Sequence, residues 1–363
     1  MSRGEGLKSS ERIIVLRLSS IGDLILISPL LRALRRQFPQ AKLDLVTKEA
    51  FAELVRFNPN LSDIHLVRPE EGFAGLSRLG MKLRAANYDT VLDLHRNFRT
   101  SWLLQLIRPR SILRYRKHRV RRWLYVKFKT KTMQGVPPVY ARYLAAAHSL
   151  GVGEDGNGLE LFWRSEHEQQ AEQALLQLGW IPGMPLVALA PGAGFFTKRW
   201  PIEHFAELAS QILERFAYIG IAIVGGRNET GLGRQISEYV NQPQRSGGRV
   251  FDLTGKCSLL TSAVVIQRSR LLVTNDSGPM HMAEAVRTPL IMLAGSTTRE
   301  LGFFPQSPTS RVLEVDLPCR PCSHLGRQAC PLGHFRCMRE IAPELVAAEV
   351  ENVLRQVAVG SRQ

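Results

Sequence analysis

The chain has 363 residues, of which 44% are hydrophobic and 22% are charged, and its formal net charge is +16 at pH 7. This length allows two domains that each bury a core, and the proportions are ordinary for a soluble globular protein. No run of 18 or more apolar residues is present, which excludes a hydrophobic membrane-spanning helix. Arg17, Gly22 and Asp23 interrupt the first apolar stretch, so we expect no cleavable signal peptide and a cytoplasmic protein.

Short apolar runs alternate with helical patterns along the whole chain. In the first half, strands are predicted at 12–18, 42–47, 63–67 and 88–94, with helices at 23–37 and 74–86. In the second half, strands are predicted at 185–191, 218–226, 270–276 and 289–295, followed by a helix at 343–358. Such alternation is typical of parallel sheets covered by helices on both faces.

A glycine-rich stretch at 151–158 is the predicted break between two domains. We therefore expect an α/β protein with two doubly wound domains, at 1–160 and 161–342, and a C-terminal helix within 343–363. Ligands of such sheets bind beyond the carboxyl ends of the strands, and the three most informative turns follow predicted strands.

The first of these turns reads SSIGD and ends at Asp23. Ser19 or Ser20 can cap the helix that follows, and Gly22 allows a ligand to approach the backbone closely. Asp23 has two interpretations. It is either a first-turn carboxylate stabilised by the helix dipole, by about 0.3–1 kcal/mol, or a general base at the edge of an interdomain cleft.

The second turn follows the strand at 185–191 and precedes a helix that begins at Pro201. It contains Lys198 and Arg199, two adjacent cations placed before a helix N-terminus. This arrangement suits a diphosphate, although an exposed Lys-Arg pair would have the same sequence.

The third turn, TNDSGPMH, is the most specific. Asn275, Asp276 and Ser277 supply side-chain acceptors, Gly278 opens a helix, and His281 lies early in that helix. A helix cap would explain one of these residues but not the whole cluster, so the turn predicts a ligand-binding site.

The chain contains, in this order, LSSIGDLILISPLLRALRRQFP, PGAGFFTKRWPIEHFAELA, VGGRNE and TNDSGPMHMAEAVRTPLIMLAGST. This series resembles the motifs of glycosyltransferase family 9, the lipopolysaccharide heptosyltransferases, and the resemblance extends from about residue 12 to 340. It implies two facing Rossmann-like domains, the GT-B architecture. It also implies transfer of a heptose from ADP-heptose to the inner core of lipopolysaccharide, on a lipid A-Kdo or heptosyl acceptor.

The resemblance further implies roles for individual residues. Asp23 matches the catalytic base of the family, with Ser20 and Gly22 beside it in the turn that faces the acceptor. Lys198 matches the lysine that contacts the donor phosphates, and Glu229 matches the acidic residue near the nucleoside ribose. The other expected donor-binding residues are Thr197, Arg199, Asn275, Asp276, Ser277, Gly278 and His281.

These residues also indicate the type of reaction. A carboxylate can take the proton that an acceptor hydroxyl loses as it attacks the anomeric carbon, which typically accelerates transfer ~10²–10⁴-fold. Lys198 and a helix N-terminus can compensate the charge of the departing nucleoside diphosphate, and the chain contains no D-x-D metal motif. We therefore expect an inverting single displacement that requires no cofactor.

The positive charge is concentrated in one segment. No Asp or Glu occurs between Asp93 and Glu154, whereas thirteen Lys and Arg lie between Arg96 and Lys131. A solvated basic face is one interpretation, but arginines dominate and aromatic residues are interleaved, which favours a surface that binds phosphate groups. We assign the run to the acceptor and to the anionic face of the inner membrane. The expected acceptor-binding cations are Arg96, Arg116, Lys117, Arg119, Arg121 and Arg122.

Four of the five cysteines lie close together near the C-terminus, at Cys319, Cys322, Cys330 and Cys337. Their number suits a structural zinc site, although six residues separate the second pair where two to four are usual. Disulfides are not expected in a reducing cytoplasm. Structural zinc and four reduced thiols in a compact loop are both open, and the resemblance implies that transfer does not need this loop.

Three functions are compatible with these features. The first is a heptosyltransferase, the second is a GT-B transferase that uses another nucleotide sugar, and the third is a non-catalytic polyanion-binding protein. Asp23 and Lys198 argue against the third, and no module that reads RNA or DNA accompanies the basic run, so nucleic acid is not an expected partner. The expected partners are a nucleotide sugar, a lipopolysaccharide precursor and the cytoplasmic face of the inner membrane, where the protein would be peripheral.

Overall fold

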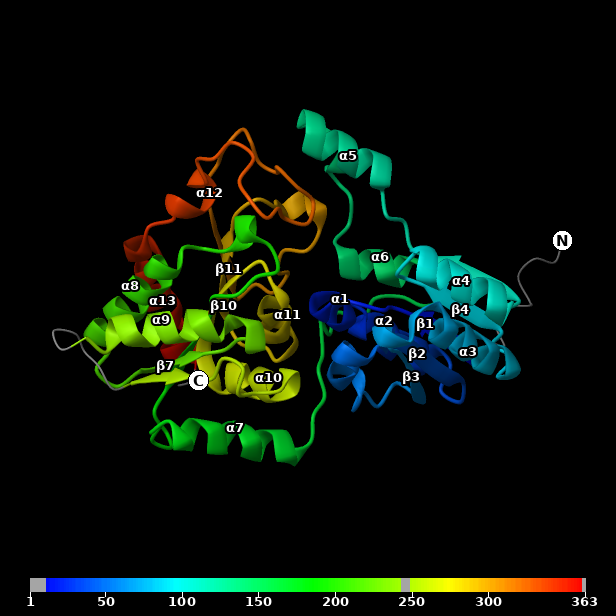
Figure 1. Ribbon diagram of the computed structural model, residues 1–363, viewed down its shortest axis with the longest axis horizontal. Coiled ribbons are helices and arrows are strands. Elements are labelled where there is room, and N and C mark those ends of the chain that lie inside the picture. The colour runs from blue at the N-terminus through cyan, green and yellow to red at the C-terminus, as the bar shows by residue number, and fades with distance from the viewer. Residues whose placement is uncertain (1–10, 243–248, 361–363) are drawn as a thin grey trace. The chain divides into compact units, whose positions relative to one another are not determined.

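The computed structural model describes residues 11–242 and 249–360. Contacts group the chain into two compact units, whose elements Figure 1 labels. The first unit is Met1–His118 with Pro137–Trp163, and the second is Arg119–Val136 with Arg164–Gln363. The segment Arg119–Val136 thus packs with the second unit, where the sequence predicted one continuous first domain over 1–160.

The described part of the first unit contains a five-stranded parallel sheet in the order β3-β2-β1-β4-β5. Its strands are β1 (Arg12–Leu16), β2 (Lys42–Lys48), β3 (Asp63–Val67), β4 (Thr90–Asp93) and β5 (Ser111–Arg114). Its helices are α1 (Ile21–Leu26), α2 (Ser28–Gln37), α3 (Gly72–Ala85), α4 (Phe98–Ile107) and α6 (Val139–Ala145). Short 3-10 turns lie at Glu49–Val55, Pro69–Glu71 and His148–Leu150.

The helix predicted over 23–37 is two helices that meet at Ile27. Pro29 lies in the first turn of α2, where a missing N–H costs nothing, whereas the interior of a continuous helix would not tolerate it. The short strand β5 was not predicted. It has only four residues, and half-buried side chains alternate with exposed ones along it, so it lacks the apolar run that marked the central strands.

The strand order of the first unit reverses next to β1. The chain builds β1, β2 and β3 outward in one direction and then returns to place β4 on the other side of β1. Leu16 and Asp93 are partners at the ends of β1 and β4. The turns that follow these two strands therefore lie at the topological switch point, where open α/β sheets bind their ligands.

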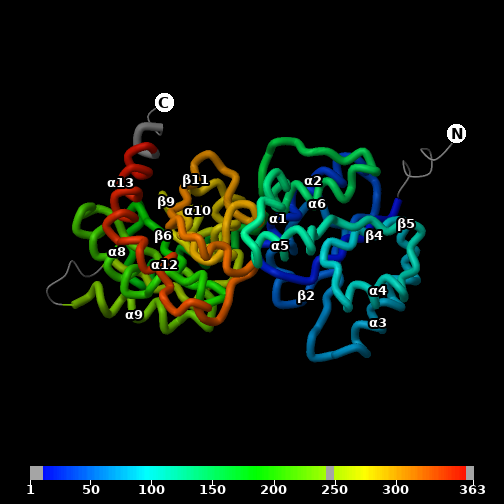
Figure 2. The backbone as a smooth tube through the Cα atoms, turned by 90° about the horizontal axis from the view of Figure 1, so that it is seen from above, coloured from blue at the N-terminus to red at the C-terminus, as the bar shows by residue number. Residues whose placement is uncertain are grey.

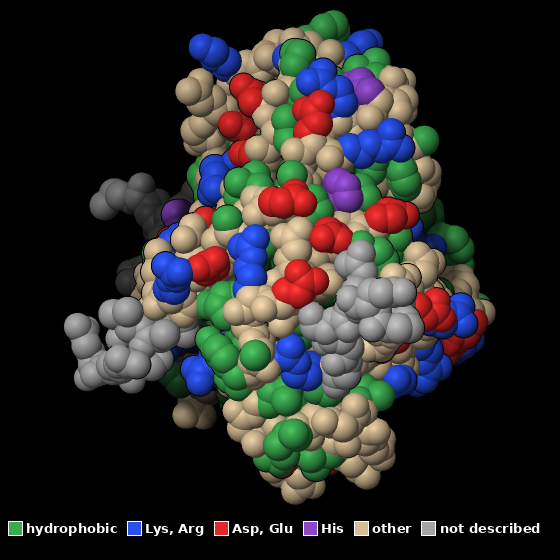
Figure 3. All heavy atoms as spheres, turned by 90° about the vertical axis from the view of Figure 1, so that its left-hand side faces the viewer, with side chains coloured by type: hydrophobic (Ala, Val, Ile, Leu, Met, Phe, Trp, Pro, Cys, Tyr) green, Lys and Arg blue, Asp and Glu red, His purple; other side chains and the backbone are tan. Residues whose placement is uncertain are grey.

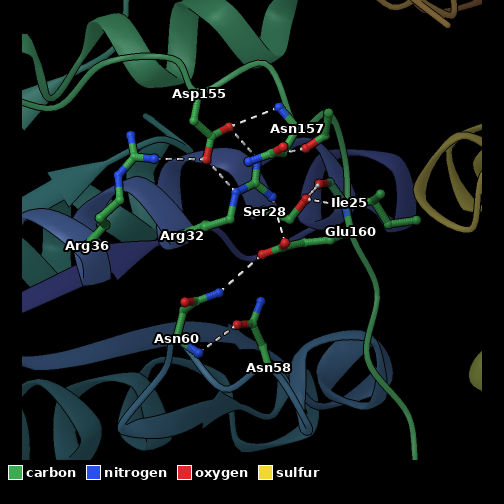
Figure 4. Close-up of polar contacts among 10 residues, drawn as sticks. Ile25, Ser28, Arg32, Arg36, Asn58, Asn60, Asp155, Asn157 and Glu160 are labelled. Atoms are coloured by element: carbon green, nitrogen blue, oxygen red, sulfur yellow. Dashed lines mark hydrogen bonds and ion pairs between the residues drawn. The ribbon is translucent and has the colours of Figure 1, made fainter. Parts of the chain in front are cut away.

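The chain leaves the first unit along a segment that is tied to α2 (Figure 4). Arg32 donates to both carboxylate oxygens of Asp155, at 2.7 Å each, and to Glu160 at 2.6 Å. Glu160 also accepts from Asn60 at 3.1 Å, and its backbone N–H donates to Ser28 at 3.0 Å. Because one half-buried guanidinium holds two carboxylates, this segment is fixed on the first unit up to residue 160.

The described part of the second unit contains a six-stranded sheet in the order β11-β10-β9-β6-β7-β8. Its strands are β6 (Leu186–Ala190), β7 (Gly220–Ile223), β8 (Val250–Asp252), β9 (Ser269–Asn275), β10 (Leu290–Ala294) and β11 (Ser310–Glu314). Its helices are α5 (Arg119–Phe128), α7 (Ser165–Gln177), α8 (Ile202–Arg215), α9 (Thr230–Val240), α10 (Leu259–Arg268), α11 (Gly278–Ala285), α12 (Arg336–Arg339) and α13 (Pro343–Gly360). Short 3-10 turns lie at Lys131–Met133, Phe196–Lys198, Arg227–Glu229 and Arg299–Leu301.

The second sheet has its own switch point, between β6 and β9. The chain runs outward through β6, β7 and β8 and returns to place β9 on the other side of β6. The predicted final helix forms α13 and packs against α8, as Figure 2 shows. Trp200 and Phe205 are fully buried in the core of this unit, which fixes the turn after β6 on its sheet.

Across residues 11–242 and 249–360, no helix is both long enough and apolar enough to cross a membrane.

Candidate functional site

The Asp23 carboxylate lies at the switch point of the first unit and is surrounded by donors. The hydroxyl of Tyr143, in α6, donates to its Oδ1 at 2.9 Å. On the other oxygen, Arg17 forms an ion pair, and the backbone and hydroxyl of Ser20 donate at 3.2 and 3.1 Å. Asp23 is therefore far more than a residue stabilised by the helix dipole, because four separate donors hold its carboxylate.

The environment of Asp23 determines its charge. Burial alone would raise the pKa of Asp23, but the charge of Arg17 and the hydrogen bonds from Tyr143 and Ser20 outweigh it, so its pKa lies below its usual value. The carboxylate is thus ionised at neutral pH. An ionised, oriented carboxylate in the first turn of the helix that follows a central strand is able to accept a proton from a bound hydroxyl.

Arg17 also connects the two strands of this switch point. Its guanidinium donates to the carbonyl of Leu94, just after β4, at 2.6 Å, and to the carbonyl of Ser19 at 2.8 Å. His95 follows Leu94, and its buried Nδ1 has no hydrogen-bond partner among the described residues. Burial, together with the charges of Arg17 and Lys117, lowers the pKa of His95 to about 4, so its ring is neutral at physiological pH.

The expected acceptor-binding cations are divided between the two units. Arg96, Arg116 and Lys117 belong to the first unit, as do Ser20 and Gly22. Arg96 donates to the carbonyl of Tyr115 at 2.8 Å, Lys117 bonds to the carbonyls of His95 and Arg96, and Arg116 is exposed.

Arg119, Arg121 and Arg122 belong to the second unit, on α5. The sequence predicted that the whole basic run belongs to one domain, at 1–160. The structure instead divides the run between the two units. The chain crosses from the first unit to the second at residue 119, in the middle of the run.

Lys198 and Asp276 meet at the switch point of the second unit. The ammonium of Lys198 lies 2.7 Å from Oδ2 of Asp276, and the hydroxyl of Thr297 donates to the same oxygen at 2.6 Å. Burial would raise the pKa of Asp276, but Lys198 and Thr297 outweigh it, so the pKa lies below its usual value. The second and third polar turns of the sequence are thus brought together, with the Lys198 side chain 15% exposed.

Asn275 has a structural role in this arrangement. Its amide donates to the carbonyl of Pro191 at 2.8 Å and accepts from the backbone N–H of Trp200 at 3.0 Å. These bonds use the side chain to join β9 to the turn after β6, and the residue is completely buried. Asn275 was expected to contact the nucleotide-sugar donor, but in this structure none of its atoms is exposed for such a contact.

Two of the other expected donor-binding residues are also engaged with the backbone. The buried hydroxyl of Thr197 donates to Ser296 at 3.0 Å and accepts from the backbone of Arg327 at 2.8 Å. The guanidinium of Arg199 donates to the carbonyl of Ala193 at 2.7 Å. Both side chains hold the turn that presents Lys198.

The N-terminus of α11 begins beside the Lys198–Asp276 pair. Ser277 is its N-cap, Gly278 is its first residue, and the Ser277 side chain makes no capping hydrogen bond to the first turn. His281 is 4% exposed, and its Nδ1 lies 3.6 Å from Glu284. The free end of α11 can therefore bind an anion directly, whereas His281 lies beneath this turn and supports it.

Glu229 lies against the turns that follow β6 and β7. Its carboxylate accepts from the backbone N–H of Gly226 at 2.8 Å. A Cβ added to Gly192 would lie 1.8 Å from Oε1 of Glu229, and one added to Gly225 would lie 2.8 Å from its Oε2. Glycine at these positions is what allows the carboxylate to sit at the carboxyl edge of the sheet.

The four clustered cysteines and His334 line one small cavity in the second unit. Tetrahedral zinc bound by thiolates at about 2.3 Å needs sulfur atoms about 3.8 Å apart, and among the described residues these side chains form no group whose ligand atoms all lie within 4.8 Å. Burial raises the pKa of Cys337 to about 11, which favours the protonated thiol. In this arrangement the thiols are not close enough together to hold a zinc ion, so the structure does not support the zinc alternative, and zinc binding stays untested.

One group of potential metal ligands was not predicted from the sequence. Within the described residues, ligand atoms of Asp44, Asp63 and His65 lie within 4.8 Å of one another. Asp44 is fully buried, and its Oδ2 already accepts from Tyr88 and lies 3.0 Å from His65. These contacts explain the group as a buried hydrogen-bond network, and it lies away from the switch point, near the start of β2 and β3.

The model of glycosyltransferase family 9 (heptosyltransferase) matches residues 76–332 of this chain. The chain belongs to glycosyltransferase family 9. As a family 9 protein it is a glycosyltransferase, and the sequence prediction of this enzyme class is confirmed.

Similar proteins of known name agree with this family. Lipopolysaccharide heptosyltransferase 2 of Salmonella typhimurium is 26% identical over 356 residues, which cover 96% of this chain and 100% of that protein. A family 9 glycosyltransferase structure from Veillonella parvula has a TM-score of 0.78 at 25% identity and covers 95% of this chain and 98% of its own. The structure of ADP-heptose LPS heptosyltransferase II of E. coli has a TM-score of 0.74 at 23% identity, covering 95% and 99%. The α/β class and the GT-B architecture are thus confirmed.

Sequence reasoning missed three side chains of this family 9 protein that contact the predicted site residues. They are Arg17 and Tyr143 on Asp23, and Thr297 on Asp276. Arg17 carried a signal, since it is a cation within the apolar run at 12–18. Thr297 carried one as well, since it follows the strand predicted at 289–295 and ends the last of the four quoted motifs. Tyr143 carried none, because it approaches the site from an element distant in the sequence.

Proposed function

We propose that this protein is an inverting, metal-independent heptosyltransferase. In this proposal it transfers a heptose from ADP-heptose to the inner core of lipopolysaccharide, on a lipid A-Kdo or heptosyl acceptor. The observation that carries the proposal is the Asp23 carboxylate, ionised and held by Tyr143 and Arg17 at the switch point of the first sheet.

On the acceptor side, Asp23 is the general base. The acceptor hydroxyl gives its proton to a carboxylate oxygen of Asp23 as its own oxygen forms a bond to the anomeric carbon. The bond from that carbon to the diphosphate breaks, and the electron pair leaves with the nucleoside diphosphate. One displacement inverts the anomeric configuration. Arg17 and Tyr143 position the base and keep it ionised.

On the donor side, negative charge grows on the departing diphosphate. Lys198 and the free N–H groups of α11 compensate this charge, which is worth more in the transition state than in the bound substrate. The ion pair with Asp276 fixes the Lys198 ammonium in place. It also offsets part of the positive charge that the ammonium presents to the diphosphate. Glu229, at the edge of β6 and β7, is assigned to the ribose hydroxyls of the nucleoside.

The names of the relatives support the choice of substrates. The Salmonella relative is a lipopolysaccharide heptosyltransferase, and the E. coli structure is described as an ADP-heptose LPS heptosyltransferase. We extend both to this chain, with the inner-core acceptor and a peripheral location on the cytoplasmic face of the inner membrane as parts of the proposal. A formal charge of +16 suits a phosphorylated glycolipid in an anionic leaflet.

The test uses the purified full-length protein, a lipid A-Kdo acceptor and a panel of nucleotide sugars. ADP-heptose is expected to give the fastest release of nucleoside diphosphate, with an anomeric configuration in the product opposite to that of the donor. A chelator is expected to leave the rate unchanged. Faster turnover of another nucleotide sugar would identify that sugar as the donor in place of ADP-heptose. Retention of the anomeric configuration would exclude the single displacement.

A further inference from the structure

A groove of about 720 Å³ lies between α5 and the cysteine-containing loop, both within the second unit. One wall is formed by α5 and the residues just after it. The other wall is formed by the loop between Cys319 and Leu332. The bond-forming and bond-breaking steps of the proposed transfer use neither wall, although Arg119 and Arg122 on the first wall were expected from the sequence to bind the acceptor.

The position of α5 on this unit is fixed by polar contacts. The hydroxyl of Tyr125 bonds to Thr298 at 2.7 Å and donates to Glu300 at 2.8 Å. The ammonium of Lys129 donates to the carbonyls of Pro321 and Val126. These contacts hold the helix against the loop, although none of its residues is fully buried.

The groove is strongly basic. Its lining residues include five cations, Arg119, Arg122, Lys127, Lys129 and Arg327, and no carboxylate. The face of this unit that carries α8, α9 and α13 differs, because Figure 3 shows acidic and basic side chains interspersed there. Ion pairs between these helices, such as Arg215 of α8 with Glu351 of α13, neutralise local charge. The charge of the groove is not neutralised in this way by its own walls.

Large apolar side chains surround the same cations. Trp123 is 53% exposed and Phe128 56% exposed on α5, and Leu332 is 62% exposed on the loop. The rings of Trp123 and Phe128 pack edge to face at 5.4 Å, with the ammonium of Lys127 over both. Exposed aromatic and leucine side chains beside clustered cations are typical of helices that lie in the interface of a bilayer.

We propose that this groove is the surface through which the protein docks on an anionic phospholipid bilayer. The cations bind the lipid phosphates, and Trp123, Phe128 and Leu332 enter the interfacial region. Charge and exposed apolar area together favour this occupant, because a soluble phosphate would satisfy the cations but leave the apolar rim in water. The inference rests on the proposed function only for the identity of the membrane, the leaflet that holds the acceptor.

The test measures co-sedimentation of the full-length protein with vesicles of phosphatidylcholine alone or with 30% phosphatidylglycerol by mole, a composition chosen as roughly that of an anionic leaflet. We expect binding to the anionic vesicles only, weakening with salt because exposed charges are screened over ~10 Å at 0.1 M. Lys127→Gln with Arg327→Gln should lower the partition coefficient about 30-fold, which corresponds to ~1 kcal/mol for each cation. Trp123→Ser with Leu332→Ser should lower it at unchanged net charge.

The matched control replaces two exposed arginines of the same unit that lie outside the groove, Arg234→Gln with Arg270→Gln. It removes the same charge and is expected to change vesicle binding by less than about threefold. Thermal melts of all three variants should match the original protein. If the control variant loses as much vesicle binding as the groove variants, binding depends on net charge alone and the proposal is wrong. An unchanged partition coefficient in both groove variants would also overturn it.

Two further measurements separate this inference from the proposed function. Binding of ADP is expected to be unaltered in the groove variants. Arg327 contacts Thr197, in the turn that carries Lys198, only through its backbone, and the substitutions change side chains. Binding of a deacylated, phosphorylated core saccharide is expected to be equally unaltered. If the groove variants lose that saccharide and keep their vesicle binding, the groove is an acceptor subsite and the membrane proposal is wrong.

Discussion

Tyr143 donates a hydrogen bond to Asp23 over 2.9 Å, although the two residues are 120 positions apart in the sequence. The same tyrosine packs edge to face on Tyr115, with ring centroids 4.9 Å apart, and lies beneath the guanidinium of Arg17. The Asp23 carboxylate is therefore part of a packed assembly and does not lie on a mobile turn. The contacts with Tyr143 and Arg17 both orient the Asp23 carboxylate and lower its pKa.

The Asp23→Asn variant should keep donor binding and lose transfer. The amide has nearly the same shape but cannot accept the hydroxyl proton, so kcat should fall ~10²-fold or more. Single-turnover assays and ADP titration measure the two properties separately. Turnover within a few-fold of the original protein would leave Asp23 as a structural partner of Arg17.

The Tyr143→Phe variant should shift the acid limb of the pH–rate profile upward. The hydroxyl helps to hold the pKa of Asp23 below its ordinary value of 3.8, so its removal raises that pKa and protonates the base at a higher pH. The ring contacts with Tyr115 and Arg17 are kept. A profile of kcat/KM between pH 4 and 8, about the range in which carboxylates and histidines titrate, measures the shift.

The same low pKa makes a prediction about stability. Since the folded pKa of Asp23 is depressed, its contribution is present above the unfolded pKa and is lost as the pH falls through the folded value. The midpoint of acid unfolding should therefore lie at higher pH in Tyr143→Phe. An unchanged midpoint and an unchanged rate profile would show that this hydrogen bond does not control the base.

Substitutions of Lys198 should be compared singly and with Asp276. Lys198→Met leaves a buried carboxylate without its cation, which typically destabilises a protein by about 3–5 kcal/mol, so lost activity alone would be ambiguous. The double variant Lys198→Met with Asp276→Asn removes both charges and should recover most of the stability. Its kcat should nevertheless stay low, because the leaving diphosphate has lost its cation. Recovery of kcat together with stability would assign Lys198 a structural role.

Glycine substitutions next to Glu229 test its assignment to the ribose. In Gly192→Ala, the new Cβ would lie 1.8 Å from Oε1 of Glu229, so the carboxylate must move. We expect the affinity for ADP to fall about tenfold, or ~1.4 kcal/mol. Gly194→Ala is the matched control, because a Cβ there has nothing within 4 Å. Calorimetric titration of both variants measures the difference, and equal affinities would separate Glu229 from the nucleotide.

The sequence alone determined the local parts of this protein. Buried strands such as β1 and β6 are short, continuous apolar runs because both faces of a parallel sheet are covered, so they were visible without the structure. The turns that carry Asp23, Lys198 and Asp276 were found because polar residues directly after such strands must lie at the carboxyl edge. Strands with half-buried residues, such as β5 and β11, had no such signal.

Tertiary structure decided which of these residues act together. Contacts across long sequence separations placed Tyr143 on Asp23, Thr297 on Asp276 and the Asn275 side chain on the backbone of Pro191. Such contacts also assign α5 to the second unit, because Tyr125 and Lys129 form hydrogen bonds with residues of that unit. Periodicity and spacing report only neighbours along the chain. Hydrogen bonds between distant elements depend on how the sheets and helices pack, and no local pattern records that.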